Sequence, residues 1–369
     1  MIVSFFYLNA YSSVGGIQKF NTNVITALSI IGQEQNHTIN LLSLHDQEKD
    51  LSPALKVNFK SAFHNKFRFL LFSLFYLIRS DVVFLGHCNL AFPITILNKY
   101  IFRKKIYLFI HGIEVWSPLP YHKTQALKDC EGIFSVSNFT ADKAISIHHL
   151  DTLKVSIFPN TLDPFTPFAI AQEKPISLLK KYNLKDTDNI ILTITRLSYT
   201  EKGKGYDKVI AALPAILRHT PNLKYILAGK IDNNENVRIQ HLIKSFGVES
   251  SVIIAGFIAP SELVAHYQLC DLFVMPSTKE GFGIVFIEAT ACGKPTMGGN
   301  IDGTPEALLY GQLGYLVNPN STDEIQKGIE AFFSHQWPEH LTNAQHLHSL
   351  TLQKFGFEQM KFNLRKYLA

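Results

Sequence analysis

The chain has 369 residues, of which 46% are hydrophobic and 18% are charged. At ~100–200 residues per domain this length predicts two domains, and a chain of this size needs neither disulfides nor metals to hold its core. The 35 Lys and Arg against 30 Asp and Glu give a net charge of +5. That balance excludes a disordered tail protein and argues against a dedicated nucleic-acid binder.

Short apolar segments alternate along the chain with segments of helical periodicity. Strands are predicted at residues 2–8, 38–43, 81–85, 105–110, 132–136, 155–158, 189–195, 224–228, 251–255, 272–275, 295–297 and 314–317. Helices are predicted between them, for example at residues 18–31, 207–218, 237–246 and 260–270. Repeated strand–helix–strand units with fully apolar strands indicate parallel sheets covered on both faces. Two successive sets of strands indicate two doubly wound α/β domains rather than one large sheet.

Prolines mark the connection between the two sets of strands. Four of them, at positions 159, 164, 167 and 175, fall close together, which is typical of a connector. We expect an N-terminal domain at 1–165, a linker at 166–185, a C-terminal domain at 186–350 and a C-terminal helix at 351–369. Packing of this helix back on the N-terminal domain stays open as one interpretation. Residues 1–180 hold 17 basic and 12 acidic residues and the remainder holds 18 of each, so the net charge of +5 belongs to the first half.

Cysteine usage and the first residues bear on the compartment. The four cysteines are Cys88, Cys130, Cys270 and Cys292, and each lies beside an apolar run without C-x-x-C or zinc-finger spacing. We therefore expect buried free thiols in a reducing compartment. The first ten residues resemble a strand and lack the positive region of a signal peptide. Both features predict a cytoplasmic protein.

One apolar segment, residues 64–79, has basic residues at both ends and aromatic residues between them. It is too short to span a bilayer. Two interpretations stay open: a helix that lies in the membrane interface with its cations on anionic headgroups, and a helix buried between strands. The first interpretation predicts peripheral attachment to the inner face of the cytoplasmic membrane.

Two loops of the first half carry candidate binding residues. Gly15 and Gly16 stand between the first strand and the first helix, where small residues and a helix N-terminus suit a phosphate. An ordinary tight turn is the alternative for this pair. His111 closes a strand and is followed by Gly112, and ligands of open α/β sheets bind at the carboxyl ends of strands. A structural histidine is the alternative there.

A basic loop opens the second half. Arg196 ends the first strand of that domain, and Lys202-Gly203 and Lys204-Gly205 precede the next helix. Arginine and lysine beside a helix N-terminus can hold a diphosphate from two sides. A solvated basic turn is the alternative. Lys204 is preferred over Lys202 because it lies directly before the helix.

The most specific motif is Glu280-Gly281-Phe282-Gly283 followed by Glu288. If the helix starts at about Gly283, Glu280 lies in the loop before it and Glu288 about one and a half turns inside it. One carboxylate then faces a sugar and the other a ribose, while the loop N–H groups point at phosphate. An accidental pair of carboxylates on an amphipathic helix is the alternative, and the Gly-Phe-Gly sequence argues against it.

Together these residues resemble the retaining glycosyltransferases of family 4. The likeness covers nearly the whole chain, and it is specific at 195–207 and 275–306 and looser in the first half. The bacterial enzymes that build exopolysaccharide and lipopolysaccharide, among them the xanthan-type mannosyltransferases, are similar. The resemblance implies the GT-B fold: two Rossmann-like domains facing a cleft, with the acceptor on the first and the nucleotide sugar on the second.

The resemblance also implies roles for the site residues. Arg196 and Lys204 would neutralise the donor diphosphate, and Gly16, beside Gly15, would close over it. Glu288 would bind the ribose hydroxyls and Glu280 the sugar. The backbone N–H groups of Phe282 and Gly283, beside Gly281, would hold the leaving phosphate. His111 would contact the transferred sugar. The loop with Phe257 and Ile258 would contact the base through backbone groups.

The implied reaction is hexosyl transfer with retention, from GDP-mannose as first choice or a UDP-sugar as second, to a lipid-linked or polysaccharide acceptor. No cofactor and no divalent metal are expected, because Asp186-Thr187-Asp188 precedes a strand and lies at the wrong sheet end for a ligand. Two alternatives remain open: a non-hydrolysing nucleotide-sugar epimerase, and a non-catalytic nucleotide-sugar-binding protein of the same fold.

Overall fold

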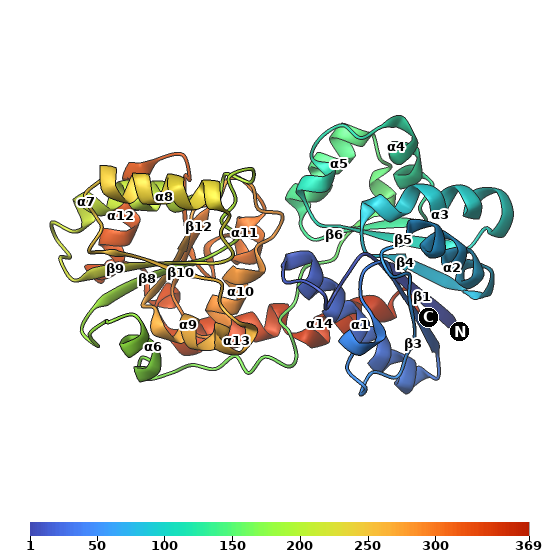
Figure 1. Cartoon of the computed structure of the whole chain (residues 1–369), viewed down its shortest axis with the longest axis horizontal. Coiled ribbons are helices and arrows are strands. Elements are labelled where there is room, and N and C mark those ends of the chain that lie inside the picture. The colour runs from blue at the N-terminus through green and yellow to red at the C-terminus, as the bar shows by residue number, and fades with distance from the viewer. Residues whose placement is uncertain (369) are drawn as a thin grey trace. The chain divides into compact units, whose positions relative to one another are not determined.

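The computed structural model describes residues 1–368; Ala369, the last residue of the expected C-terminal helix, lies outside the described residues. The chain forms two compact units (Figure 1). Unit 1 comprises Met1–Pro164 and the segment from Phe355 onward, and unit 2 comprises Phe165–Lys354. Residues 166–185, expected as a linker, belong to unit 2 and include the short helix α6 (Ile176–Lys181).

Unit 1 contains a parallel seven-stranded sheet with the order β3-β2-β1-β4-β5-β6-β7. Its strands are β1 (Ile2–Tyr7), β2 (Thr38–Ser43), β3 (Asn58–Ser61), β4 (Val82–Leu85), β5 (Lys105–Ile110), β6 (Gly132–Ser135) and β7 (Val155–Ile157). Strand β3 was not predicted, because its sequence Asn-Phe-Lys-Ser is short and largely polar. Such a strand is stable at the edge of the sheet, where β2 alone pairs with it.

Helices cover both faces of this sheet. On one face, α1 (Gly16–Gln35) packs with α14 (Phe357–Arg365), over an aromatic layer in which the rings of Phe134 and Tyr367 lie 4.5 Å apart. The other face carries an aliphatic core beneath four helices. They are α2 (Lys66–Arg79), α3 (Ala91–Leu97), α4 (Tyr121–Lys128) and α5 (Asn138–His148).

Unit 2 contains a parallel six-stranded sheet with the order β10-β9-β8-β11-β12-β13. Its strands are β8 (Asn189–Ile194), β9 (Leu223–Ala228), β10 (Val252–Gly256), β11 (Leu272–Met275), β12 (Thr296–Gly299) and β13 (Tyr315–Val317). Helices α7 (Tyr206–Ile216), α8 (Asn233–Ser245) and α12 (Thr322–Phe333) cover one face (Figure 1). The remaining helices are α9 (Leu263–Leu269), α10 (Ile284–Ala291), α11 (Thr304–Ala307) and α13 (Ala344–Phe355).

In each sheet the strand order reverses at one point, between β1 and β4 in unit 1 and between β8 and β11 in unit 2. Open α/β sheets bind ligands beside such a point, outside the carboxyl ends of the strands. The prediction of two doubly wound parallel-sheet domains is confirmed. The four cysteines are buried and free, as expected. None of the helices in residues 1–368 combines the length and the apolar character that a membrane span requires.

Candidate active site

The basic loop and the acidic loop of unit 2 follow the two strands that flank the reversal point. Lys204, in the loop after β8, forms an ion pair with Glu280, in the loop after β11, with 2.7 Å between Nζ and Oε2. Their side chains are only 17% and 20% exposed. Two groups that are 76 residues apart in sequence thus meet where a ligand is expected.

Glycine lets these two loops approach each other. Gly205 has a φ of +79°, and a Cβ there would lie 2.1 Å from the carbonyl oxygen of Pro276. A backbone hydrogen bond also joins the two loops, because the Thr278 N–H donates to the Gly203 carbonyl over 2.7 Å. Any other residue at 205 would force the loops apart, because its Cβ would overlap the backbone of Pro276.

The other two cations of the basic loop are engaged elsewhere. Lys202 places its ammonium 4.2 Å from the centre of the Tyr199 ring. Arg196 pairs with Glu201 of its own loop at 3.0 Å and is 64% exposed. Lys204 is thus the cation of this loop that contacts Glu280, whereas the Arg196 side chain is largely exposed to solvent.

A third loop holds Glu280 in place. Asp302, which follows β12 and is buried, accepts hydrogen bonds from the Glu280 N–H (2.8 Å), the Thr304 N–H (2.9 Å) and the Ser277 hydroxyl. The Gly303 N–H donates to the Glu280 carbonyl over 2.8 Å. Burial raises the pKa of the Asp302 carboxyl. Both backbone groups of Glu280 are therefore bound by the loop after β12. Asp302 is not among the residues predicted for the site, although an acidic residue just past a buried strand is a usable signal.

Helix α10 starts at Ile284, with Gly283 before it at a φ of +91°, in agreement with the expected start. Phe282 is 2% exposed. Glu288 lies on this helix and is also 2% exposed, and its Oε2 accepts from the Tyr267 hydroxyl at 2.9 Å. Tyr267, on α9, was not singled out from the sequence. Its hydroxyl orients the Glu288 carboxylate.

Helix α8 also holds the basic loop in place. Asp232, the N-cap of α8, accepts from the Tyr199 N–H over 2.8 Å. Glu235 is fully buried, where it accepts from the Tyr206 hydroxyl and forms an ion pair with Arg238. These contacts fix both ends of the loop that carries Lys202 and Lys204. No local sequence pattern predicts these contacts, because they join residues about thirty positions apart.

The loop expected to contact a base follows β10. Phe257 is 56% exposed and Ile258 is 8% exposed. Gly256 has a φ of +71°, and its carbonyl accepts from the Gly229 N–H at 2.8 Å. The loop therefore lies at the same edge of the sheet as the basic loop, with its backbone tied to the end of β9.

In unit 1 the structure places His111 directly after β5. Its Nε2 lies 3.0 Å from the Gly86 carbonyl, and its backbone N–H donates to the Glu114 carboxylate. Burial lowers the pKa of the imidazole, so the ring is neutral at pH 7. Because a carbonyl only accepts, Nε2 carries the proton and Nδ1 is left as an acceptor.

His87 was missed by the sequence analysis, although it follows the end of β4 as His111 follows β5. Its Nδ1 accepts from the Asn89 N–H over 3.1 Å. Burial, with His111 and Lys123 nearby, lowers the pKa of His87 to about 4. The carboxyl edge of unit 1 therefore holds two neutral imidazoles side by side along the sheet.

The loop with Gly15 and Gly16 is shaped by a buried acid. Asp46 is fully buried and accepts from the N–H groups of Ala10 (2.7 Å) and Ser12 (2.9 Å). Gly16 opens α1, and a Cβ there would meet open space. The ring of Phe20, one turn further along α1, lies 4.9 Å from that of His111. Unit 1 thus brings the glycine pair and His111 to one edge of its sheet.

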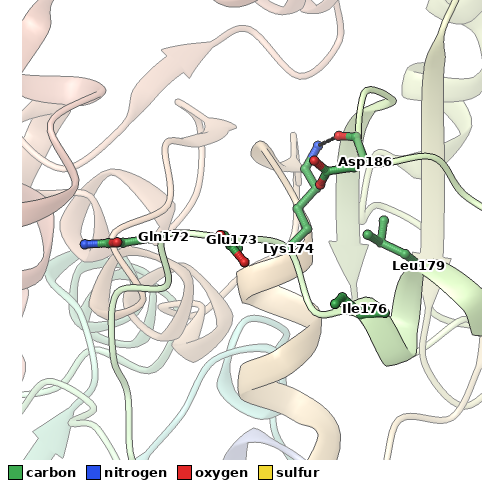
Figure 2. Close-up of a pocket in the computed structure, with 6 residues that line it drawn as sticks. All are labelled: Gln172, Glu173, Lys174, Ile176, Leu179 and Asp186. Carbon is green, nitrogen blue, oxygen red and sulfur yellow. Dashed lines mark hydrogen bonds between the residues drawn. The ribbon is translucent and has the colours of Figure 1, made fainter.

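One hollow of about 510 Å³ in unit 2 lies away from all of these residues. Figure 2 shows it between the segment with Gln172, Glu173 and Lys174, the start of α6, and Asp186. The Lys174 ammonium donates to the Asp188 carbonyl (2.7 Å) and pairs with Asp271 (2.9 Å), just before β8 and β11 begin. This pocket and the Asp186-Thr187-Asp188 turn therefore lie at the amino edge of the sheet, opposite the basic loop. Within residues 1–368 no group of three or more His, Cys, Asp or Glu is arranged to hold a metal ion.

Residues 177–346 match the family model described as glycosyl transferases group 1. The matched residues make up most of unit 2. The GDP-mannose-dependent alpha-(1-6)-phosphatidylinositol monomannoside mannosyltransferase of Mycolicibacterium smegmatis is 29% identical over 65% of this chain and 64% of its own length. The serotype-specific mannosyltransferase WbdA of Escherichia coli is 29% identical over 57% of this chain and 25% of its own length. The matched region thus spans less than two thirds of either relative.

Solved structures match the chain over its whole length. A glycosyltransferase from Rickettsia africae has a TM-score of 0.81 at 21% identity, covering 99% of this chain and 97% of that one. Anabaena Alr3699/HepE in complex with UDP also has a TM-score of 0.81, at 17% identity, covering 100% and 99%. At these identities the likeness concerns the fold. The GT-B fold class, with two Rossmann-like domains, is confirmed, as is the resemblance to glycosyltransferases.

Proposed function

We propose that this chain is a glycosyltransferase that moves a hexosyl group from a nucleotide sugar to a lipid-linked or polysaccharide acceptor in surface-glycan synthesis. The observation that carries the proposal is the Lys204–Glu280 pair, held at the reversal point of unit 2 by the loop after β12. The proposed donor site lies on unit 2, and the proposed acceptor side on unit 1.

Charge supports these roles. Breaking the bond between the anomeric carbon and the diphosphate develops negative charge on the leaving group. Lys204 and Arg196 provide fixed positive charge, and the N–H groups of Phe282 and Gly283 are proposed as phosphate donors. A diphosphate competes with Glu280 for Lys204, because it carries more negative charge than one carboxylate. Glu280, once released from the ammonium, is then available to accept from the sugar hydroxyls.

The remaining roles are proposed residue by residue. Glu288, oriented by Tyr267, binds the ribose. The backbone of Phe257 and Ile258 contacts the base. In unit 1, Gly16 has open space where a Cβ would stand, which leaves room for a phosphate oxygen. His111 offers its Nδ1 lone pair to a hydroxyl of the transferred sugar.

We propose retention at the anomeric carbon and no metal requirement. The acceptor oxygen bonds to the carbon on the face from which the diphosphate leaves, and the acceptor proton passes to the departing phosphate oxygen. The cations of the basic loop take the place of a metal ion. Activity that persists in a chelator supports this proposal, and loss restored by a divalent cation contradicts it.

GDP-mannose is the proposed donor, with a UDP-sugar as second choice. The names of two relatives support mannose: one is described as GDP-mannose-dependent and the other as a mannosyltransferase. The UDP complex of a protein with the same fold supports the second choice. We also propose a cytoplasmic enzyme that attaches peripherally to the inner face of the membrane.

A thermal-shift screen of nucleotide sugars, followed by transfer assays on lipid-diphosphate sugars, tests the function. A new glycosidic bond of retained configuration supports it. Conversion of the donor to its epimer without transfer identifies an epimerase. Donor binding without any turnover on a wide set of acceptors identifies a binding protein, and either result overturns the proposal.

A further inference from the structure

Helix α2 has two apolar faces, of which the sheet covers only one. Its buried face consists of Phe69, Ser73 and Leu77. A second stripe, with spacings of four, four and three residues, stays on one side of the helix because an α-helix has about 3.6 residues per turn. Its members are between 48% and 69% exposed, and they are Phe67, Leu71, Phe75 and Ile78.

A neighbouring element carries two further exposed apolar residues. Helix α2 packs against α3 and against the helical turn Asn98–Phe102 that follows it. Tyr100 and Ile101 in that turn are 78% and 61% exposed. We name these two residues, together with the exposed stripe of α2, the outer face of unit 1. Large contiguous apolar patches on a protein surface mark interaction sites.

The stretch of chain that carries the outer face is rich in positive charge. Residues 51–110 contain nine Lys and Arg and a single acidic residue, Asp81, whose carboxylate accepts from the Ile2 N–H. The guanidinium of Arg79 lies 3.7 Å from the centre of the Phe75 ring. Long basic side chains whose stems lie along apolar surface can place their charge at a lipid headgroup while the rings enter the hydrocarbon boundary.

We propose that the outer face binds an anionic lipid bilayer, with α2 lying in the plane of the interface. A bilayer with negative headgroups matches both its apolar residues and its cations. A second copy of the chain fits less well, because a symmetric contact would set like charges against each other. The inference deepens the peripheral attachment proposed above: it names the surface, its second element and the lipid class.

Flotation of the full chain with two kinds of vesicle tests the inference. We expect binding to vesicles of equal parts phosphatidylcholine and phosphatidylglycerol, and at least tenfold weaker binding to phosphatidylcholine alone. The variant F67S/L71S should lower the partition coefficient at least tenfold, since a buried Leu or Phe side chain contributes about 1.5–3 kcal/mol. The variant K66Q/R68Q should lower it about 25-fold, since each cation near an anionic surface contributes about 1 kcal/mol, or about fivefold.

Leu153→Ser is the matched control. Leu153 is 91% exposed and belongs to unit 1, but it lies just before β7, which is the edge strand opposite β3. It is therefore not part of the outer face. The variant should bind vesicles as the parent does. Equal vesicle binding by the parent and by F67S/L71S overturns the inference. Equal binding of the parent to vesicles with and without phosphatidylglycerol also overturns it. A dimer that F67S/L71S dissociates also overturns it, because the face then binds a second copy. Nucleotide-sugar binding, measured by thermal shift on the same variants, keeps failure of this inference separate from failure of the proposed function.

Discussion

Replacing Lys204 by alanine tests the proposed site most directly. The change removes the ammonium 2.7 Å from Glu280, and with it the proposed charge on the departing diphosphate. Removal of one fixed donor to developing negative charge typically costs about 10²–10³ in kcat. We expect a loss in that range, measured as initial rate of transfer at saturating donor.

The same variant should remain folded. Both side chains of the pair keep some contact with water, so Glu280 is not left as a fully buried lone charge. We expect a loss of about 1 kcal/mol, typical of a pair that is partly solvated, which lowers Tm by about 2–4 °C for a unit of this size. Differential scanning calorimetry measures this change and shows whether lost activity reflects unfolding.

Lys202→Ala is the matched control, two residues away in the same loop. Its ammonium contacts the Tyr199 ring and not Glu280. Surface substitutions of this kind change the free energy of unfolding by about 0.5 kcal/mol or less. Because the variant keeps the Lys204–Glu280 pair, its transfer rate should stay close to that of the parent. The reasoning is refuted if Lys204→Ala retains a near-normal rate, or if Lys202→Ala loses as much activity.

Three further predictions concern the supports of the two sites. Asp302→Ala should lower kcat with little change in nucleotide binding, because the Glu280 N–H and the Ser277 hydroxyl lose their acceptor. Each buried polar group left unsatisfied costs about 1–3 kcal/mol of stability. Unchanged kinetics with a lowered Tm would show that Asp302 has a purely structural role. Gly205→Ala should reduce both Tm and activity, because its Cβ would lie 2.1 Å from the Pro276 carbonyl at a φ of +79°; a fully active, equally stable variant would contradict the geometry of the two loops. The stability of unit 1 should fall as pH decreases from 6.5 toward 4, because burial holds the pKa of His87 in the folded protein at about 4. Over this pH range His87 binds a proton in the unfolded chain but not in the folded one, which favours unfolding. In His87→Gln the slope of Tm against pH in that window should be smaller, with His111 and His45 supplying the rest, and an unchanged slope would contradict the assignment.

Local sequence signals were enough for much of the fold. The twelve predicted strands are all present, because a parallel strand buried on both faces is a short apolar run whatever its neighbours are. The start of α10 followed from Gly283, since that glycine adopts a backbone conformation that ends the loop. The exception was β3, whose polar residues carry no such pattern.

The same distinction holds for the candidate site: local signals predicted some of its residues but not the residues that support them. Lys204, Glu280 and His111 could be named because each lies next to a glycine in the loop that follows a strand, and such loops lie at the carboxyl edge of a parallel sheet. Their supports could not be named. Asp302 and Glu235 act on groups more than twenty residues away, and those contacts depend on which strands and helices become neighbours.

By itself, then, the sequence determined the two α/β units, the loops that carry the polar groups and the uneven distribution of charge, because each follows from residues that are close in the chain. Only the tertiary structure decided that Lys204 pairs with Glu280 while Lys202 does not. It also decided which apolar face of α2 the sheet covers and which it leaves exposed. Periodicity shows that a helix has an apolar face, but burial depends on the elements that pack against it. Those elements meet through long-range contacts that no short stretch of sequence contains.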